Sequence, residues 1–67
     1  MTIYQKIEQE IEQARQKFPV FHSQHEAYAV ILEELDEYWE LVKRDECGHE
    51  ELIQVAAMCV AAIRETR

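Results

Sequence analysis

Apolar residues recur along the chain with the three-to-four-residue period of a helix, and three segments carry this pattern. The first segment, residues 1–18, has a narrow apolar seam on an otherwise polar rod, formed by Ile3, Ile7, Ile11, Ala14 and Phe18. Thr2 and Gln5 have the spacing of a capping box at its start, and Pro19 follows its end. This segment is therefore predicted to be a helix followed by a short apolar link.

The second segment, residues 23–45, opens with another capping-box sequence, from Ser23 to Glu26. Its apolar stripe consists of Ala27, Ile31, Leu35, Tyr38 and Val42. After the break at Gly48, the third segment covers residues 49–66, and between residues 52 and 63 every side chain is apolar except that of Gln54. A helix that is apolar on all sides is a buried helix, and this short chain can cover only part of it. The remaining face is expected to contact another subunit.

These segments predict an all-α fold: three helices with a central antiparallel helical hairpin, assembled into an oligomeric helical bundle. The 67 residues contain one Gly, one Pro and no repeat or linker, so a single domain spanning residues 1–67 is expected. A domain of about 60 residues buries only about 60% of the surface of its unfolded chain and is marginally stable. Additional stability is expected from a partner chain, a metal ion or a ligand.

The charge balance limits the possible partners. Fourteen acidic residues against seven basic ones give a net charge of −7, which argues against a nucleic acid or an anionic membrane as partner. A small polyanion can still bind together with a divalent cation. Cys47 and Cys59 are too few for a disulfide scaffold and lack metal-site spacing. The chain shows no signal peptide, and its apolar runs fall short of the ~20 residues that span a bilayer. We therefore expect a cytoplasmic protein.

Acidic residues at helical spacing are the candidate chemistry. Glu34 and Glu37 share a face of the second helix, between the aliphatic Val30 and Leu41, and have no basic partner four residues on. Glu51 lies in the first turn of the third helix, on a packed face. The short connection predicts that these three carboxylates and the amide oxygen of Gln54 face one point. Hard oxygen donors of this kind suit Mg²⁺ or Mn²⁺, which can activate water and bridge phosphate oxygens.

Each of these features also has an ordinary structural explanation. Acidic side chains are normal on solvated helix faces, and Glu50 and Glu51 in a first turn complement the helix dipole. Trp39 can stack on a nucleobase and Lys43 can reach a phosphate, but aromatic residues on helices usually pack in a core or an interface. A lysine near a helix C-terminus likewise complements the dipole. The spacing alone leaves both interpretations open.

The motif Glu33-Glu34-x-x-Glu37, followed by Glu51-x-x-Gln54, resembles the signature of the MazG-type all-α nucleoside triphosphate pyrophosphohydrolases, which is EExxE, a spacer and ExxD. The resemblance covers about residues 23–65 and includes small MazG-like proteins of phage and bacterial origin. It implies Mg²⁺ ligands at Glu34, Glu37 and Glu51, with Glu33 as an auxiliary acid that orients or activates water. The implied reaction hydrolyses a nucleoside or deoxynucleoside triphosphate to the monophosphate and pyrophosphate. Homodimers or homotetramers, with sites that involve more than one subunit, are also implied.

Gln54 departs from the family pattern, because the signature ends in Asp. A neutral amide oxygen can ligate Mg²⁺, but it removes one negative charge and weakens the attraction to the ion. The sequence therefore leaves a second possibility open: a catalytically inactive MazG-like helical oligomer that acts as a protein-interaction module.

Overall fold

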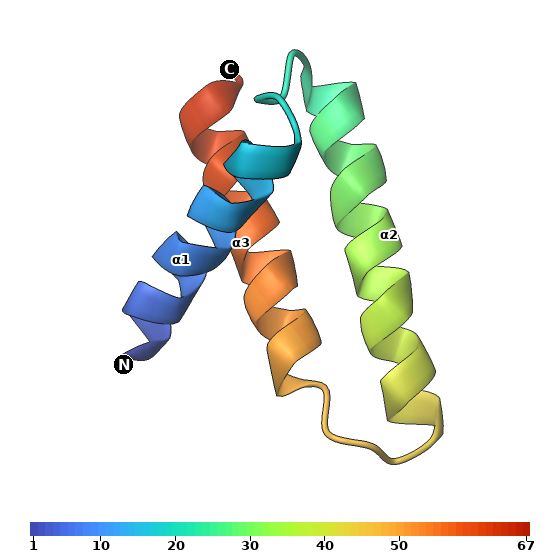
Figure 1. Cartoon of the computed structure of the whole chain (residues 1–67). Helices are drawn as coiled ribbons and strands as arrows, with labels where there is room; N and C mark the ends of the chain where they lie inside the picture. Colours follow the sequence, from blue (N-terminus) through green and yellow to red (C-terminus); the bar gives the residue numbers. More distant parts are fainter.

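The chain folds into three helices and contains no strand, as seen in a computed structural model that describes all of residues 1–67 (Figure 1). The helices are α1 (Ile3–Lys17), α2 (Gln24–Lys43) and α3 (His49–Glu65). The predicted all-α fold is confirmed. None of the helices combines the length and the hydropathy that crossing a bilayer requires.

The helix starts follow the capping signals of the sequence. At α1 both bonds of the capping box form: Gln5 N donates to Thr2 Oγ1 at 3.1 Å, and Thr2 N donates to Gln5 Oε1 at 2.8 Å. At α2 the Ser23 hydroxyl accepts from Glu26 N at 3.1 Å. The Glu26 carboxylate instead accepts from His22 N, at 3.3 Å. The second capping box is therefore half formed. The Glu26 carboxylate instead holds the link that precedes α2, through His22 N.

The end of α2 is set by Asp45, which stands in the left-handed region at φ 55°. Asp45 N donates to Val42 O at 3.1 Å and Glu46 N donates to Leu41 O at 3.0 Å, the bond pattern of a Schellman motif. This position is usually a glycine, so the sequence carries no obvious stop signal there. As a result, α2 ends before the predicted residue 45.

Gly48 is buried and serves a close approach between helices. A Cβ at this position would lie 2.6 Å from Cδ1 and 2.7 Å from Cε1 of the Tyr38 ring. The φ of Gly48 is −113°, which any residue can adopt, so space is what requires a glycine here. The first turn of α3 can therefore start directly against the last turns of α2.

α3 is the central element of the fold. It packs against both α1 and α2, whereas the Cα atoms of α1 and α2 stay more than 8 Å apart. In Figure 1, α2 and α3 run in opposite directions on either side of their short connection. α3 supplies half of the buried core, which consists of Ile11, Phe21, Ala27, Ala57, Met58 and Ala61. The alanines of α3 let its neighbours approach closely.

The inward face of α2 differs from the predicted stripe. Ala27 is buried and Ile31 and Tyr38 are half-buried, but Leu35 and Val42 are 45% and 37% exposed. The face toward α3 instead includes three half-buried residues outside that stripe, Val30, Glu34 and Leu41. An exposed row remains on α2, here called the α2 apolar stripe: Tyr28, Leu32, Leu35, Trp39 and Val42. Because α2 is apolar on two sides, periodicity alone could not select the buried one.

Candidate metal centre and adjoining cleft

Three carboxylates from two helices converge on one point. One oxygen from each of Glu34, Glu37 and Glu51 lies within 4.8 Å of the other two. Glu34 and Glu51 are half-buried, while Glu37 is exposed. The sequence spacing predicted this convergence, and the geometry has a simple origin. Glu34 and Glu37 stand one turn apart on α2, and the short connection sets the first turn of α3 beside them.

The cluster carries strong negative charge without a basic partner. None of the ion pairs in the chain includes Glu34, Glu37 or Glu51. Burial raises the pKa of the Glu34 carboxyl, and the negative charges of Glu37, Glu51 and Glu33 raise it further. A bound cation would relieve this repulsion. The three carboxylates therefore form a group that could hold a divalent cation.

Gln54 bridges two members of the cluster. In the amide orientation that satisfies both groups, its side-chain nitrogen donates to Glu34 Oε2 at 2.9 Å and to Glu51 Oε2 at 3.2 Å. The amide nitrogen thus supplies part of the positive charge density that a cation would supply. Ligation through the amide oxygen requires a half-turn of the same amide, so the role of Gln54 as a ligand stays a prediction.

The donor set fits Mg²⁺ in its chemistry. This ion takes oxygen ligands at about 2.0–2.1 Å in an octahedron, so that ligand oxygens lie about 3 to about 4 Å apart. The three carboxylate oxygens are within 4.8 Å of one another, which is close to this spacing. Mg²⁺ typically keeps several waters and binds a few carboxylates together with substrate phosphates. Glu34, Glu37 and Glu51 are thus the residues that could hold such an ion.

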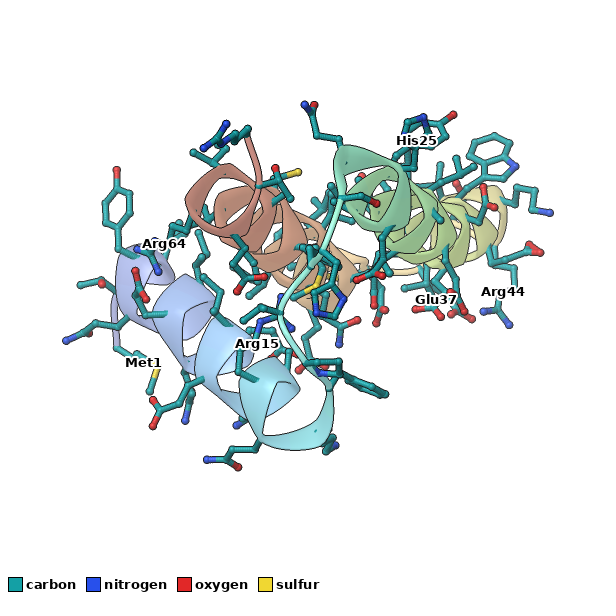
Figure 2. The ribbon with its side chains drawn as sticks, turned by 90° about the horizontal axis from the view of Figure 1, so that it is seen from above. Met1, Arg15, His25, Glu37, Arg44 and Arg64 are labelled. Atoms are coloured by element: carbon teal, nitrogen blue, oxygen red, sulfur yellow. The ribbon has the colours of Figure 1, made fainter.

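A cleft of about 630 Å³ adjoins the cluster. It exists because α1 and α2 flank α3 without packing against each other, which leaves α3 as the floor. On the α2 side it is lined by Glu26, Val30, Glu33 and Glu34, and on the floor by Gln54 and Met58. The end of α1 and the link after it supply the other wall, including Gln13, Arg15, Lys17, Phe18 and Phe21. Figure 2 shows Arg15 and Glu37 on one side of the molecule and His25 on the other.

The remaining predicted site residues are divided between this cleft and the opposite surface. Glu33 is exposed and lines the cleft beside Glu34. Trp39 is 55% exposed and belongs to the α2 apolar stripe. Lys43 Nζ lies 2.6 Å from Glu40 Oε2 and 6.0 Å from the centre of the Trp39 ring. Neither Trp39 nor Lys43 lines the cleft, and their proposed contacts with a substrate stay predictions.

Sequence reasoning missed the wall that α1 contributes. Lys17 forms no ion pair and Phe18 is 65% exposed, although both side chains line a cleft next to the acidic cluster. No local motif marks these residues, because they meet α2 only through packing on α3. The one available signal is Phe18, the last position of the apolar seam of α1.

No protein-family model, curated protein or solved structure matches this chain. The resemblance of its two acidic motifs to the MazG-type signature therefore stays a prediction, and function must be argued from the residues themselves.

Proposed function

We propose that this protein is a cytoplasmic, Mg²⁺-dependent nucleoside triphosphate pyrophosphohydrolase of the MazG type. The observation that carries the proposal is the convergence of Glu34, Glu37 and Glu51 within 4.8 Å beside a cleft of about 630 Å³. Clefts that bind small molecules typically enclose about 300–1,000 Å³, so a nucleotide is of suitable size. A net charge of −7 makes a cation necessary for binding a triphosphate here.

The residues around the cleft have distinct roles in this proposal. Glu34, Glu37 and Glu51 would hold the cation, which would supply Lewis-acid chemistry to the phosphates and to an attacking water. Glu33, exposed on the cleft side of Glu34, orients the attacking water and accepts its proton. Lys17 faces the same cleft from α1 and complements the negative charge of the phosphates.

The proposal also includes the finer architecture. The α2–α3 pair forms the hairpin that carries both acidic motifs, and the α2 apolar stripe joins two copies of the chain into a homodimer or homotetramer. Five large apolar side chains in one exposed row support this assembly, because monomeric proteins rarely leave such a surface in water.

Release of pyrophosphate tests the activity directly. Purified protein is incubated with each of the common ribonucleoside and deoxyribonucleoside triphosphates, with Mg²⁺ and with a chelator. We expect Mg²⁺-dependent release of pyrophosphate and the matching monophosphate from at least one of them. Glu51→Gln should abolish turnover, while Asp36→Asn, an exposed α2 acid outside the cluster, should retain it. Absence of turnover with every nucleotide at all Mg²⁺ concentrations would overturn the proposal.

One observation favours a second candidate, an inactive helical oligomer that serves as an interaction module. The Gln54 amide already satisfies oxygens of Glu34 and Glu51 at 2.9 and 3.2 Å without a cation. This candidate predicts no turnover and no rise of the melting temperature with Mg²⁺, together with retained self-association. The enzyme predicts that Mg²⁺ raises the melting temperature, since a ligand that binds only the folded state stabilises it.

A further inference from the structure

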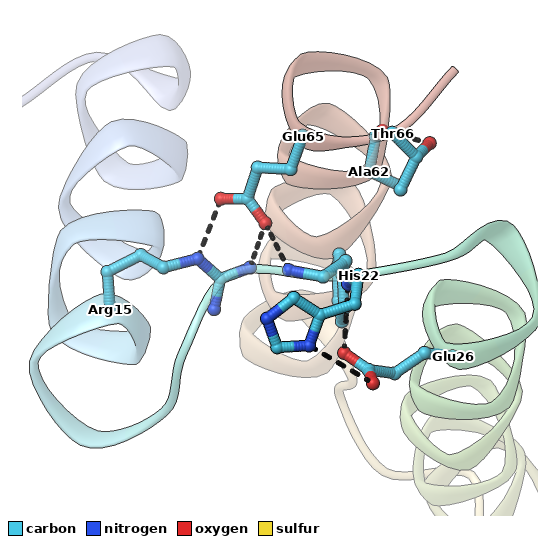
Figure 3. A network of polar contacts seen from close by, with 7 residues as sticks. Arg15, His22, Glu26, Ala62, Glu65 and Thr66 are labelled. Atoms are coloured by element: carbon cyan, nitrogen blue, oxygen red, sulfur yellow. Dashed lines mark hydrogen bonds and ion pairs between the residues drawn. The ribbon is translucent and has the colours of Figure 1, made fainter.

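Glu65, the last residue of α3, binds the Arg15 side chain of α1 (Figure 3). Its carboxylate accepts from Arg15 Nε at 2.7 Å, from Arg15 Nη2 at 2.6 Å and from Phe21 N at 2.9 Å. The Arg15 and Glu65 side chains are only 19% and 15% exposed. The Arg15 guanidinium also stacks over the Phe21 ring, 4.9 Å from its centre. One carboxylate thus fixes Arg15 of α1 and Phe21 of the following link through three hydrogen bonds, here called the clamp.

Both clamped residues line the cleft, while Glu65 itself does not. They stand on either side of Phe18 and Pro19, which also line it. In the link between α1 and α2, Phe18, Pro19 and Val20 are exposed, so the link is held at Phe21, which is buried and donates to Glu65, and at His22, whose N donates to Glu26. Glu65 therefore sets where this wall stands relative to the acidic cluster on α2. Because the clamp uses Nε and Nη2, the Nη1 group of Arg15 stays free of hydrogen bonds within the chain.

We propose that Glu65 is a positioning residue for nucleotide binding: by holding Arg15 and Phe21, it fixes the α1-side wall against which the nucleotide lies. This inference rests on the proposed function, because it takes a nucleotide as the occupant of the cleft. It concerns affinity for the nucleotide and leaves the cation site unchanged. Loss of the clamp should weaken nucleotide binding without weakening the binding of the metal alone.

The chain offers a matched control. Arg64 of α3 donates to Glu8 of α1 with both terminal nitrogens, Nη1 to Oε2 at 3.0 Å and Nη2 to Oε1. This pair also joins α1 to α3, but its side chains are 52% and 55% exposed and neither residue lines the cleft. Glu8→Ala therefore removes an Arg–Glu link between the same helices without touching the wall.

Titration calorimetry measures the binding of Mn²⁺ alone, and then of the α,β-imido analogues of the common ribonucleoside and deoxyribonucleoside triphosphates in the presence of Mn²⁺. For the analogue that binds best, Glu65→Ala should weaken binding about tenfold or more, because a displaced wall misplaces the ligand. The affinity for Mn²⁺ alone should stay within about twofold. Glu65→Gln keeps an acceptor for Phe21 N, so its affinity for the analogue should lie between those of Glu65→Ala and the unaltered protein. Glu8→Ala should bind the analogue as tightly as the unaltered protein. Faster hydrogen exchange at Phe21 N is expected in Glu65→Ala only.

Unchanged analogue affinity in folded Glu65→Ala would overturn the inference and leave the proposed function standing. If Glu65→Ala does not fold, Arg15→Lys is measured in its place. Lysine keeps the positive charge but cannot form the bidentate hydrogen bonds to Glu65. Unchanged affinity in Arg15→Lys would then overturn the inference. If no analogue binds the unaltered protein, the proposed function fails and the inference fails with it.

Discussion

Glu34 occupies an unusual place for a carboxylate, since it stands on the face of α2 that packs against α3. Burial and the neighbouring acids raise its pKa above the usual glutamate value. The folded state therefore holds the proton more tightly than the unfolded state does. It follows that this residue lowers stability progressively as pH rises from the usual glutamate pKa through the raised value.

Glu34→Gln should for this reason stabilise the metal-free protein at neutral pH. We expect a gain of roughly 0.5–1 kcal/mol in the free energy of unfolding, because like-charge repulsion is removed from a half-buried site. The gain should vanish below the usual glutamate pKa, where Glu34 is protonated in both states. Urea unfolding with a chelator, across a range of pH, measures this difference. Asp36→Asn should show no comparable gain, and an unaltered pH profile in Glu34→Gln would contradict the assignment.

Gln54 should act on stability and metal affinity in opposite directions. Gln54→Asp removes an amide that donates to Glu34 and Glu51 and adds a fourth negative charge. We expect lower metal-free stability and about tenfold tighter Mn²⁺ binding, since an added carboxylate strengthens an oxygen-ligand site. Gln54→Met has a side chain of similar shape without hydrogen-bond donors. It should lower metal-free stability and should not raise the affinity for Mn²⁺. Calorimetry and thermal unfolding test both variants; equal Mn²⁺ affinity in Gln54→Asp would exclude this position as a ligand.

At the scale of helices, local signals predicted most of what the chain forms. The caps at Thr2 and Ser23 and the helical period of apolar residues are local, so the three helices and the acidic convergence were accessible from sequence. The buried side of α2 was predicted in part only, since both of its apolar sides satisfy the same period. The clamp was not accessible, because Arg15 and Glu65 are 50 residues apart and no periodicity relates them.

The loop between α2 and α3 contains two positions whose substitution should change stability in opposite directions. Asp45 adopts φ 55°, so Asp45→Gly should stabilise the protein by up to about 1 kcal/mol by relieving left-handed strain. Gly48→Ala should destabilise it by about 1–3 kcal/mol, because the added Cβ meets the Tyr38 ring at 2.6 Å. Chemical unfolding measures both, with exposed Cys47→Ala as the control in the same loop. An unchanged free energy of unfolding in Gly48→Ala would show that the Tyr38 ring can move away from the added Cβ without cost.

At the scale of the whole molecule, the chain buries few side chains and leaves a continuous apolar row in water. The buried core has six residues, whereas the α2 apolar stripe alone contains five large exposed ones. A chain of this size is marginal by itself, so association of two stripes would supply burial that the monomer lacks. Glu34 of the acidic cluster stands on the face of α2 toward α3, so the α2 apolar stripe is a separate surface.

Leu35→Lys, in the middle of the α2 apolar stripe, should disrupt self-association. Because a buried lysine would face the same residue type across the contact, we expect the dissociation constant to rise about a hundredfold or more. Sedimentation equilibrium measures the molecular mass over a range of concentrations. Tyr4→Lys on α1, where the native side chain is 81% exposed, is the matched control and should leave assembly unchanged. A monomeric unaltered protein at high concentration would contradict the role given to the stripe.

The separation of α1 from α2 has a further consequence for motion. Each of these helices is held by α3 alone, so α1 can detach as a cooperative unit while the α2–α3 pair keeps its contacts. Its amides should then exchange with solvent at an opening free energy below that of global unfolding. When α1 detaches, the Arg15–Glu65 clamp opens and the cleft loses its α1 wall, while the carboxylates on α2 and α3 keep their positions. A nucleotide would therefore bind the closed form, in which Glu65 holds the α1 wall in place.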